Sequence, residues 1–361
     1  MLKKNLFFWF CLLAISNAMI ASDFLSLQKR VVDVFERNES AVVRVKAVYK
    51  RIIKDQKEPK VTLRVGTGFF IASDGHILTN ASLVYQSERA WIEHNGTAYS
   101  AQVVGSDPLT NIALLKVDET PEGFTFLPLD NLTVLPSIGS MSVAVSCTLE
   151  FDPAPSLGLI QGYANSFGQR VFPTVLLRIS NPAGPGEGGS PVLDLNGRLL
   201  GIMVASLPEI QSACVLPVKA VVRIRDDLLN LGKVSYSWFG LEVSKRSNLK
   251  DGGRVVIDNI VNGSPCSESL LRKGDSLISI GDYPITQIRD VHNATFFVRP
   301  EQYINIKALR GGQEIETIIQ VRARNEIVEE SVIELKPKVE AVSTPKKKVE
   351  LNSSTDSKKL K

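Results

Sequence analysis

Residues 184–193 read GPGEGGSPVL, a glycine-rich turn that leads directly into an apolar strand pattern. The flanking residues predict the fold that carries this loop.

Most of residues 40–217 consists of short apolar runs, rich in β-branched residues and bounded by Gly, Asn, Asp or Pro. The runs AVVRVKAVY (41–49), GHILTN (75–80) and IALLKV (112–117) are typical. Many short strands with turn signals and no helices between them predict antiparallel barrels or a sandwich.

Two amphipathic helices flank these strands. Within residues 19–39, apolar side chains recur at three- and four-residue steps, which predicts a helix over 23–39 that docks on the following domain. The helical period returns over 217–231, with Gly232 as the expected C-cap. The apolar face of this second helix should hold Val218, Val221, Val222, Leu228 and Leu229.

A smaller unit follows over residues 233–325. It contains strand-like runs such as WFGLEV (238–243) and YINIKALR (303–310), and a helix-like segment, DVHNATFFV (290–298). Residues 326–361 lose apolar content and gain Lys, Pro, Ser and Glu, which predicts a disordered Lys-rich tail.

Five segments in register, within residues 40–321, resemble the HtrA/Deg family of trypsin-like serine proteases with a PDZ domain. They are GTGFFIASDGHILTN (66–80), DPLTNIALLKV (107–117), SNPAGPGEGGSPVLDLNGRLLGI (180–202), ACVLPVKAVVRIRDDLLNLGKV (213–234) and GSPCSESLLRKGDSLISIGDYPI (263–285). The resemblance implies a mainly β fold: a trypsin-like double β-barrel over 40–232, followed by a small α+β PDZ domain over 233–325.

Carried over residue by residue, the catalytic positions of the family hold unsuitable side chains. The general base falls on Ser82, the aspartate that orients it on Asn111, and the nucleophile on Gly188. Glycine has no attacking atom, and a hydroxyl does not take up a proton at neutral pH as an imidazole does. The resemblance therefore implies no catalytic residue at these positions and a protein that is not an enzyme. The alternative is an active serine endopeptidase with a relocated nucleophile at Ser190.

The glycine loop is also about two residues longer than in the family. The resemblance implies that Gly186 and Gly188 are the remnant of the family's oxyanion loop, whose backbone N–H groups can bind a carbonyl or carboxylate oxygen. The alternative is a glycine turn that holds no ligand.

The PDZ-like unit keeps its expected peptide groove. Its loop resembles the one whose backbone N–H groups hold a peptide's terminal carboxylate, and the following strand would accept the peptide as an added strand. Helical spacing places side chains on the opposite wall, although packing in the core is the alternative for each of them. The implied peptide-binding residues are Phe239, Gly240, Leu241, Glu242, Val243, Val291 and Ala294.

Charge is distributed unevenly along the chain. The tail from Lys336 holds eight lysines against three acidic residues, and Lys3 and Lys4 lie near the start, so the body between them carries −3 although the whole chain carries +4. A mildly acidic body argues against nucleic acid as a partner. The tail is either a solvated linker or a weak electrostatic tether to anionic envelope polymer or lipid.

Residues 1–18 have the pattern of a signal peptide. Two lysines precede an apolar run over 6–15, and Ser16–Asn17–Ala18 is a small-x-small cleavage pattern. The run is short for a bilayer span, which favours export and cleavage over an uncleaved anchor. Export predicts a periplasmic or cell-envelope location.

The three cysteines that follow, Cys147, Cys214 and Cys266, lie in apolar contexts typical of buried small residues, although a Cys147–Cys214 bridge is an alternative. No Cys or His pair has metal-ligand spacing, so the sequence predicts no metal or other cofactor.

These features together predict an exported protein that binds peptide C-termini or unfolded proteins as an envelope chaperone, scaffold or regulator. By resemblance, it would assemble as a homo-trimer or with active relatives. Two other hypotheses stay open: the endopeptidase of protein quality control, and a structural protein tethered to the envelope by its basic tail.

Overall fold

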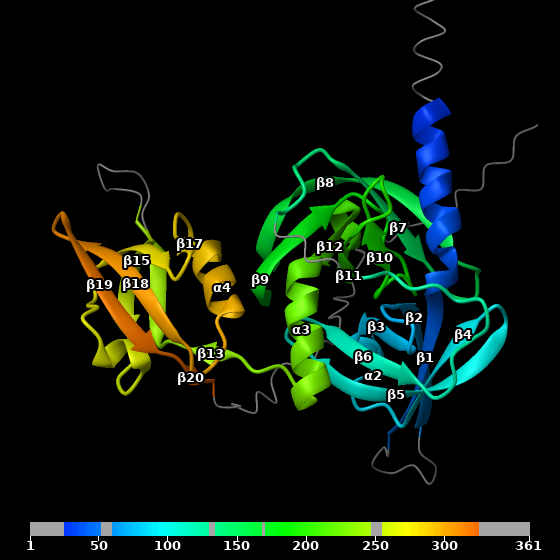
Figure 1. Cartoon of the computed structure of the whole chain (residues 1–361), viewed down its shortest axis with the longest axis horizontal. Helices are drawn as coiled ribbons and strands as arrows, with labels where there is room; N and C mark the ends of the chain where they lie inside the picture. The colour runs from blue at the N-terminus through cyan, green and yellow to red at the C-terminus, as the bar shows by residue number, and fades with distance from the viewer. Residues whose placement is uncertain (1–24, 52–59, 130–133, 168–169, 247–254, 325–361) are drawn as a thin grey trace, which may run out of the picture. The chain divides into compact units, whose positions relative to one another are not determined.

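The computed structural model describes residues 25–51, 60–129, 134–167, 170–246 and 255–324 (Figure 1). Within these residues, two six-stranded sheets each close into an antiparallel barrel, and an open six-stranded sheet with one packed helix follows them. The predicted fold class is thus confirmed. The predicted signal peptide, the first residues of the amino-terminal helix and the Lys-rich tail lie outside the described residues.

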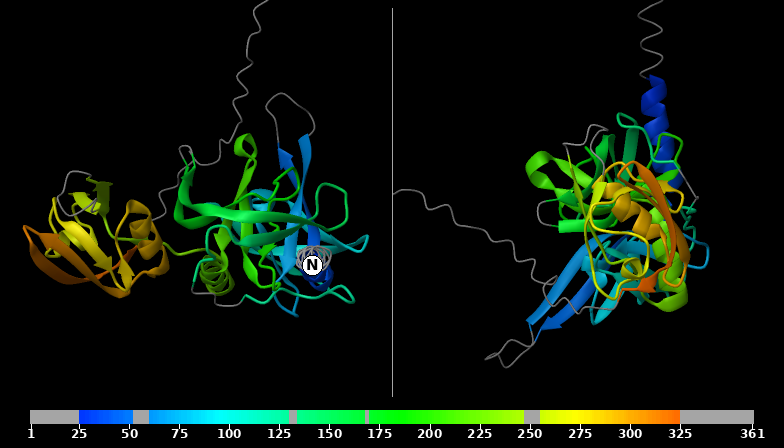
Figure 2. Two further views of the ribbon diagram at one scale, coloured as in Figure 1. Left: turned by 90° about the horizontal axis from the view of Figure 1, so that it is seen from above. Right: turned by 90° about the vertical axis from the view of Figure 1, so that its left-hand side faces the viewer.

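The first barrel has the strand order β1-β2-β3-β6-β5-β4. Alternating apolar side chains such as Val45, Ile77 and Ile92 fill its interior and are fully buried. Figure 2 shows the ends of β1 and β2 extending beyond the rest of the barrel. Its elements are β1 (Val42–Arg51), β2 (Lys60–Phe70), β3 (His76–Asn80), the one-turn helix α2 (Ala81–Val84), β4 (Arg89–His94), β5 (Thr97–Asp107) and β6 (Ile112–Val117).

The second barrel has the order β10-β11-β12-β9-β8-β7. Buried side chains such as Ile160, Leu177 and Val215 fill it, and a further core that includes Phe69 and Ile202 joins the two barrels. Its strands are β7 (Met141–Ser146), β8 (Ala154–Phe167), β9 (Arg170–Ile179), β10 (Pro191–Leu193), β11 (Leu199–Leu207) and β12 (Ser212–Pro217).

The amino-terminal helix covers residues 25–38 and docks only by its second half. Val34 is fully buried in the core and Val31 and Phe35 pack beside it, whereas Leu25 in the first turn remains 63% exposed. The predicted docking is therefore made by one face of the second half of the helix.

Helix α3 (Val218–Leu231) ends at Gly232, whose φ of 69° and N–H bond to the Leu228 carbonyl confirm the predicted C-cap. The predicted apolar face needs one correction, because Leu229 is 45% exposed and Ile224 is buried instead. Residues 221, 224 and 228 follow the three- and four-residue steps of one helix face, and residue 229 lies about 100° away from it.

In the PDZ unit, β14 lies at the end of the sheet order β14-β15-β16-β18-β19, and α4 (Ile288–Phe297) confirms the predicted helix. The core includes Val255, Ile257, Leu277 and Ile306. The strands are β13 (Ser237–Trp238), β14 (Leu241–Lys245), β15 (Val255–Ile260), β16 (Ser276–Ile280), β17 (Tyr283–Pro284), β18 (Tyr303–Arg310), β19 (Gln313–Gln320) and β20 (Arg322–Ala323).

Two further sequence predictions concern cysteines and membranes. Cys147 is a buried free thiol, so the alternative of a Cys147–Cys214 bridge is not realised, and burial raises the pKa of Cys147 and of Cys266 to about 12. No helix in the described part of the chain is long and apolar enough to cross a bilayer.

Candidate functional site

The tertiary structure brings the three triad-equivalent positions to one place between the barrels. The backbone N–H of Ser82, in α2, donates to Asn111 Oδ1 at 2.8 Å. Ser82 and Gly188 line the same pocket, and Asn111 lies behind it, 8% exposed. The three positions therefore lie at one site of the fold.

Asn111 occupies the turn between β5 and β6 with a left-handed φ of 63°, a conformation that asparagine tolerates better than most residues. Its amide nitrogen donates to the Val204 carbonyl in β11 at 2.7 Å. One side chain thus accepts from the first barrel and donates to the second, which an amide can do and a carboxylate cannot.

Asn80 fills the space beside Gly188. With its amide nitrogen turned toward the Asn111 and Met203 carbonyls, it donates to them at 3.2 and 3.0 Å and accepts from the Gly189 N–H at 3.2 Å. A Cβ atom added at Gly188 would lie 2.7 Å from this amide and would meet no other side chain or backbone atom within 3.8 Å.

The glycine loop is held in one conformation by Thr67 and Glu187. The Thr67 side chain donates to the Gly186 carbonyl at 2.8 Å and its N–H to the Gly188 carbonyl at 3.0 Å. The Glu187 carboxylate accepts from the Gly184 N–H at 2.6 Å and from the Thr148 hydroxyl at 3.0 Å. Two amides of the loop, those of Gly186 and Gly188, are without an acceptor among the described residues.

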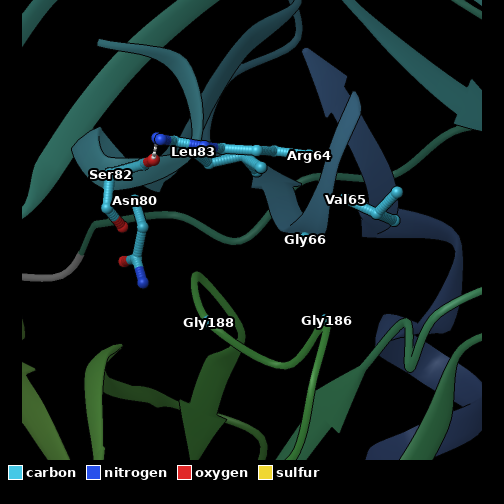
Figure 3. A pocket seen from close by; sticks show the side chains of 8 residues that line it. All are labelled: Arg64, Val65, Gly66, Asn80, Ser82, Leu83, Gly186 and Gly188. Carbon is cyan, nitrogen blue, oxygen red and sulfur yellow. Dashed lines mark hydrogen bonds between the residues drawn. The ribbon is translucent and has the colours of Figure 1, made fainter. Parts of the chain in front are cut away.

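A pocket of about 280 Å³ opens at this point (Figure 3). Arg64 extends across it, and its guanidinium donates to the Ser82 carbonyl at 2.5 Å. The pocket is lined by Arg64, Val65, Gly66, Asn80, Ser82, Leu83, Gly186 and Gly188.

None of the three histidines lines the pocket. His94 is 5% exposed and contacts the Ser40 carbonyl at 3.1 Å, and His76 pairs with Asp74 at 2.8 Å. His292 is half-buried in α4, and this burial lowers its pKa. The imidazoles are thus used elsewhere in the fold.

Ser190, the alternative nucleophile, is fully buried. Its hydroxyl donates to the Glu187 carbonyl at 2.6 Å and lies 2.8 Å from the Ser146 hydroxyl. The hydroxyl that faces the pocket is that of Ser82, which the structure leaves exposed.

In the PDZ unit, the predicted carboxylate loop is tightly fixed. Gly240 has a φ of 78°, and a Cβ there would lie 2.1 Å from Ser264 Cβ. The Phe239 and Gly240 carbonyls accept from the N–H groups of Cys266 and Val261 at 3.2 and 2.9 Å. Only glycine fits this loop without displacing its neighbour.

The two walls of the predicted groove differ in exposure. On β14, Leu241 and Val243 are half-buried and Glu242 is exposed, whereas on α4 Val291 is 7% exposed and Ala294 fully buried. Val291 and Ala294 pack in the core of this unit with Phe239, which is the alternative that the sequence left open for both.

Sequence reasoning missed Arg64, Thr67 and Asn80. Thr67 and Asn80 lie within the quoted segment over 66–80, but nothing in the sequence indicates that they contact a loop more than 100 residues away. Arg64 lies in the exposed first half of β2 and has no motif of its own.

Comparison with known proteins agrees with this geometry. Residues 66–202 match the family described as trypsin-like peptidase domain, and residues 237–321 match the PDZ domain family. The chain thus has a trypsin-like domain followed by a PDZ domain. It resembles the structure titled "HtrA-type protease AlgW with decapeptide", with a TM-score of 0.66 and 20% identity over 81% of this chain and 98% of that one. It also resembles the serine endoprotease from Yersinia pestis, with a TM-score of 0.57 and 21% identity over 82% and 98% of the two chains.

Curated relatives carry matching names. A "Probable periplasmic serine endoprotease DegP-like" of Bartonella henselae is 26% identical over 69% of this chain and 51% of its own length. A protein of the same name from Chlamydia trachomatis is 25% identical over 74% and 56%. The chain thus spans about half the length of these relatives.

These names contradict the prediction that the protein is not an enzyme. The relatives that it matches are named serine endoproteases, and its structural neighbours are titled proteases. The prediction rested only on the side chains at positions 82, 111 and 188, and their identity rules out a mechanism through those three groups but no other.

Proposed function

We propose that this chain binds polypeptide ends through its PDZ unit and acts in protein quality control in the cell envelope. The observation that carries the proposal is the fixed loop at Gly240, directly before a strand that lies at the end of its sheet. A strand in that position can accept an extended peptide by main-chain hydrogen bonding, and the loop before it can hold the terminal carboxylate.

The comparisons support this proposal in two ways. Two of the similar solved structures are titled as complexes with a decapeptide and with a tripeptide. The curated relatives are named periplasmic, which agrees with the export predicted from residues 1–18.

A matched pair of glycine variants tests the groove. Gly240 and Gly263 both have a left-handed φ, but a Cβ at Gly263 meets no atom within 4 Å. Gly240→Ala should therefore weaken binding of a peptide with a free carboxylate, and Gly263→Ala should not. The measurement is isothermal titration calorimetry of the full chain with that peptide. If both variants and the parent bind the peptide with equal affinity, the proposal is overturned.

Serine endopeptidase activity is the second candidate function, and the names of the relatives favour it. Because position 188 is glycine, another hydroxyl has to attack the peptide bond. Ser82 faces the pocket, and Ser190 is buried beneath the loop. The test is digestion of β-casein by the purified chain, with products identified by mass spectrometry, beside Ser82→Ala and Ser190→Ala.

Each outcome of the digestion experiment has one meaning. Loss of cleavage in one alanine variant identifies that serine as the nucleophile. Cleavage that is equal in the parent and both variants indicates a contaminating protease, and no cleavage by the parent rules out the endopeptidase candidate. Assembly into a trimer is tested on the same sample by its mass in solution.

A further inference from the structure

The pocket between the barrels presents hydrogen-bond donors whose acceptor is missing. The carbonyls of four lining residues are already bound: Ser82 by Arg64, Leu83 by the Tyr49 hydroxyl, and Gly186 and Gly188 by Thr67. In contrast, no described residue accepts from the Gly186 or Gly188 N–H. An occupant must therefore bring acceptors of its own.

The pocket also carries a positive charge, which favours the same kind of ligand as its N–H donors do. Arg64 is its one charged lining residue, and no carboxylate is among the eight residues that line it. The nearest acidic residue along the loop, Glu187, is bound to the Gly184 N–H and the Thr148 hydroxyl. A cation next to unpaired N–H groups favours an anion.

Arg64 is also held in place before any ligand arrives. Its guanidinium donates to the Ser82 carbonyl at 2.5 Å and lies 4.2 Å from the centre of the Tyr49 ring. Arginine keeps its charge at every physiological pH, and its planar group can bind both oxygens of a carboxylate. The exposed Ser82 hydroxyl adds a further donor at the same edge (Figure 3).

We propose that this pocket binds the terminal carboxylate of a peptide, with Arg64 and the Gly186 and Gly188 amides as the groups that hold it. A volume of about 280 Å³ is small for a drug-sized ligand and suits one residue. Leu83 and Val65 supply an apolar wall for the last side chain. The site is separate from the PDZ groove, and the proposal does not depend on whether the domain cleaves peptides.

The test uses the full chain and two probes, N-acetyl-Ala-Ala-Val with a free carboxylate and the same peptide as its C-terminal amide. Isothermal titration calorimetry should show that the free-acid peptide binds to the parent chain. Arg64→Gln should weaken this binding by roughly tenfold or more, because a charge-assisted hydrogen bond is lost. Arg64→Lys keeps the positive charge but lacks the planar guanidinium, so it should weaken binding of the free-acid peptide less than Arg64→Gln does. Arg89→Gln, another exposed arginine of the first barrel, is the control.

Three results would overturn the proposal: equal binding of acid and amide, an affinity of Arg64→Gln equal to that of the parent, or the same loss in Arg89→Gln. Sodium acetate distinguishes a small anion from a peptide end. If acetate alone binds as tightly as the peptide, the peptide part of the proposal is wrong.

The variant Gly240→Ala separates this site from the PDZ groove. If both sites bind, Arg64→Gln and Gly240→Ala each remove a different binding event, and the double variant removes both. Loss only with Gly240→Ala overturns the pocket proposal, whereas loss only with Arg64→Gln overturns the groove proposal.

Discussion

Asn111 joins the two barrels through Ser82 and Val204: its oxygen accepts from the Ser82 N–H at 2.8 Å, and its nitrogen donates to the Val204 carbonyl at 2.7 Å. The two bonds have opposite polarity and the side chain is buried. An asparagine at this position is thus a structural bridge, whatever part the site plays in chemistry.

Replacing this amide by a carboxylate should destabilise the fold. In Asn111→Asp, an oxygen faces the Val204 carbonyl, and we expect a loss of about 1–3 kcal/mol in the free energy of unfolding. Protonation of the new acid restores a donor, so the loss should shrink as the pH falls. Urea unfolding at two pH values measures both effects. Asn95→Asp, in an exposed turn with a φ of 48°, is the control, and an equal loss there would contradict the role of the Val204 bond.

Serine substitutions at two adjacent glycines should differ widely in stability. A Cβ at Gly189 would lie 2.1 Å from the Thr67 carbonyl at a φ of 92°, whereas at Gly188 it meets only the Asn80 amide. Gly189→Ser should cost more than about 4 kcal/mol or prevent folding, and Gly188→Ser about 1 kcal/mol. Thermal unfolding of both variants decides this, and similar melting temperatures would show that the loop is not fixed as described.

Glu93 should contribute to stability in a pH-dependent way. Burial acts to raise its pKa, but ion pairs with Lys46 at 2.8 Å and Arg44 at 2.9 Å outweigh burial and lower the pKa below its ordinary value of 4.5. The stabilisation is therefore present above about pH 4.5 and is lost as the pH falls through the lowered pKa.

Glu93→Gln should unfold at lower urea concentration near neutral pH and show a shallower loss of stability on acidification. Urea midpoints measured from about pH 6 down to about pH 3 follow this. The exposed Glu122→Gln serves as the control. If the urea midpoint of Glu93→Gln falls as steeply with decreasing pH as that of the parent, the prediction is contradicted.

Tyr236 should stabilise the turn that carries Asn111. Its hydroxyl donates to Asp107 Oδ2 at 2.6 Å, and the same carboxylate accepts from the Thr110 N–H at 3.0 Å. Tyr236→Phe removes one bond to a buried carboxylate and should cost about 1–3 kcal/mol. Tyr303→Phe, at a side chain that is 70% exposed, should cost nothing measurable by urea unfolding. Equal midpoints for the two variants would exclude this role.

Local patterns were sufficient for much of the architecture. Period-two runs predicted the strands, because alternate side chains must face a barrel interior, and Gly232 predicted the end of α3, because a left-handed residue closes a helix. Leu229 was assigned to the wrong face, and for Val291 and Ala294 the sequence left a groove wall and the core both open, because periodicity gives a face but not what packs against it.

The sequence patterns by themselves predicted short antiparallel strands, and the resemblance to a known family implied two β-barrels, a PDZ unit and the positions assigned to a triad. Only the tertiary structure decided what surrounds those positions. Thr67 and Gly186 are 119 residues apart, and Asn111 and Val204 are 93 apart, yet each pair is hydrogen-bonded. Such pairs meet because each sheet closes on itself and the two barrels share a core, and no local pattern records which loops that closure brings together.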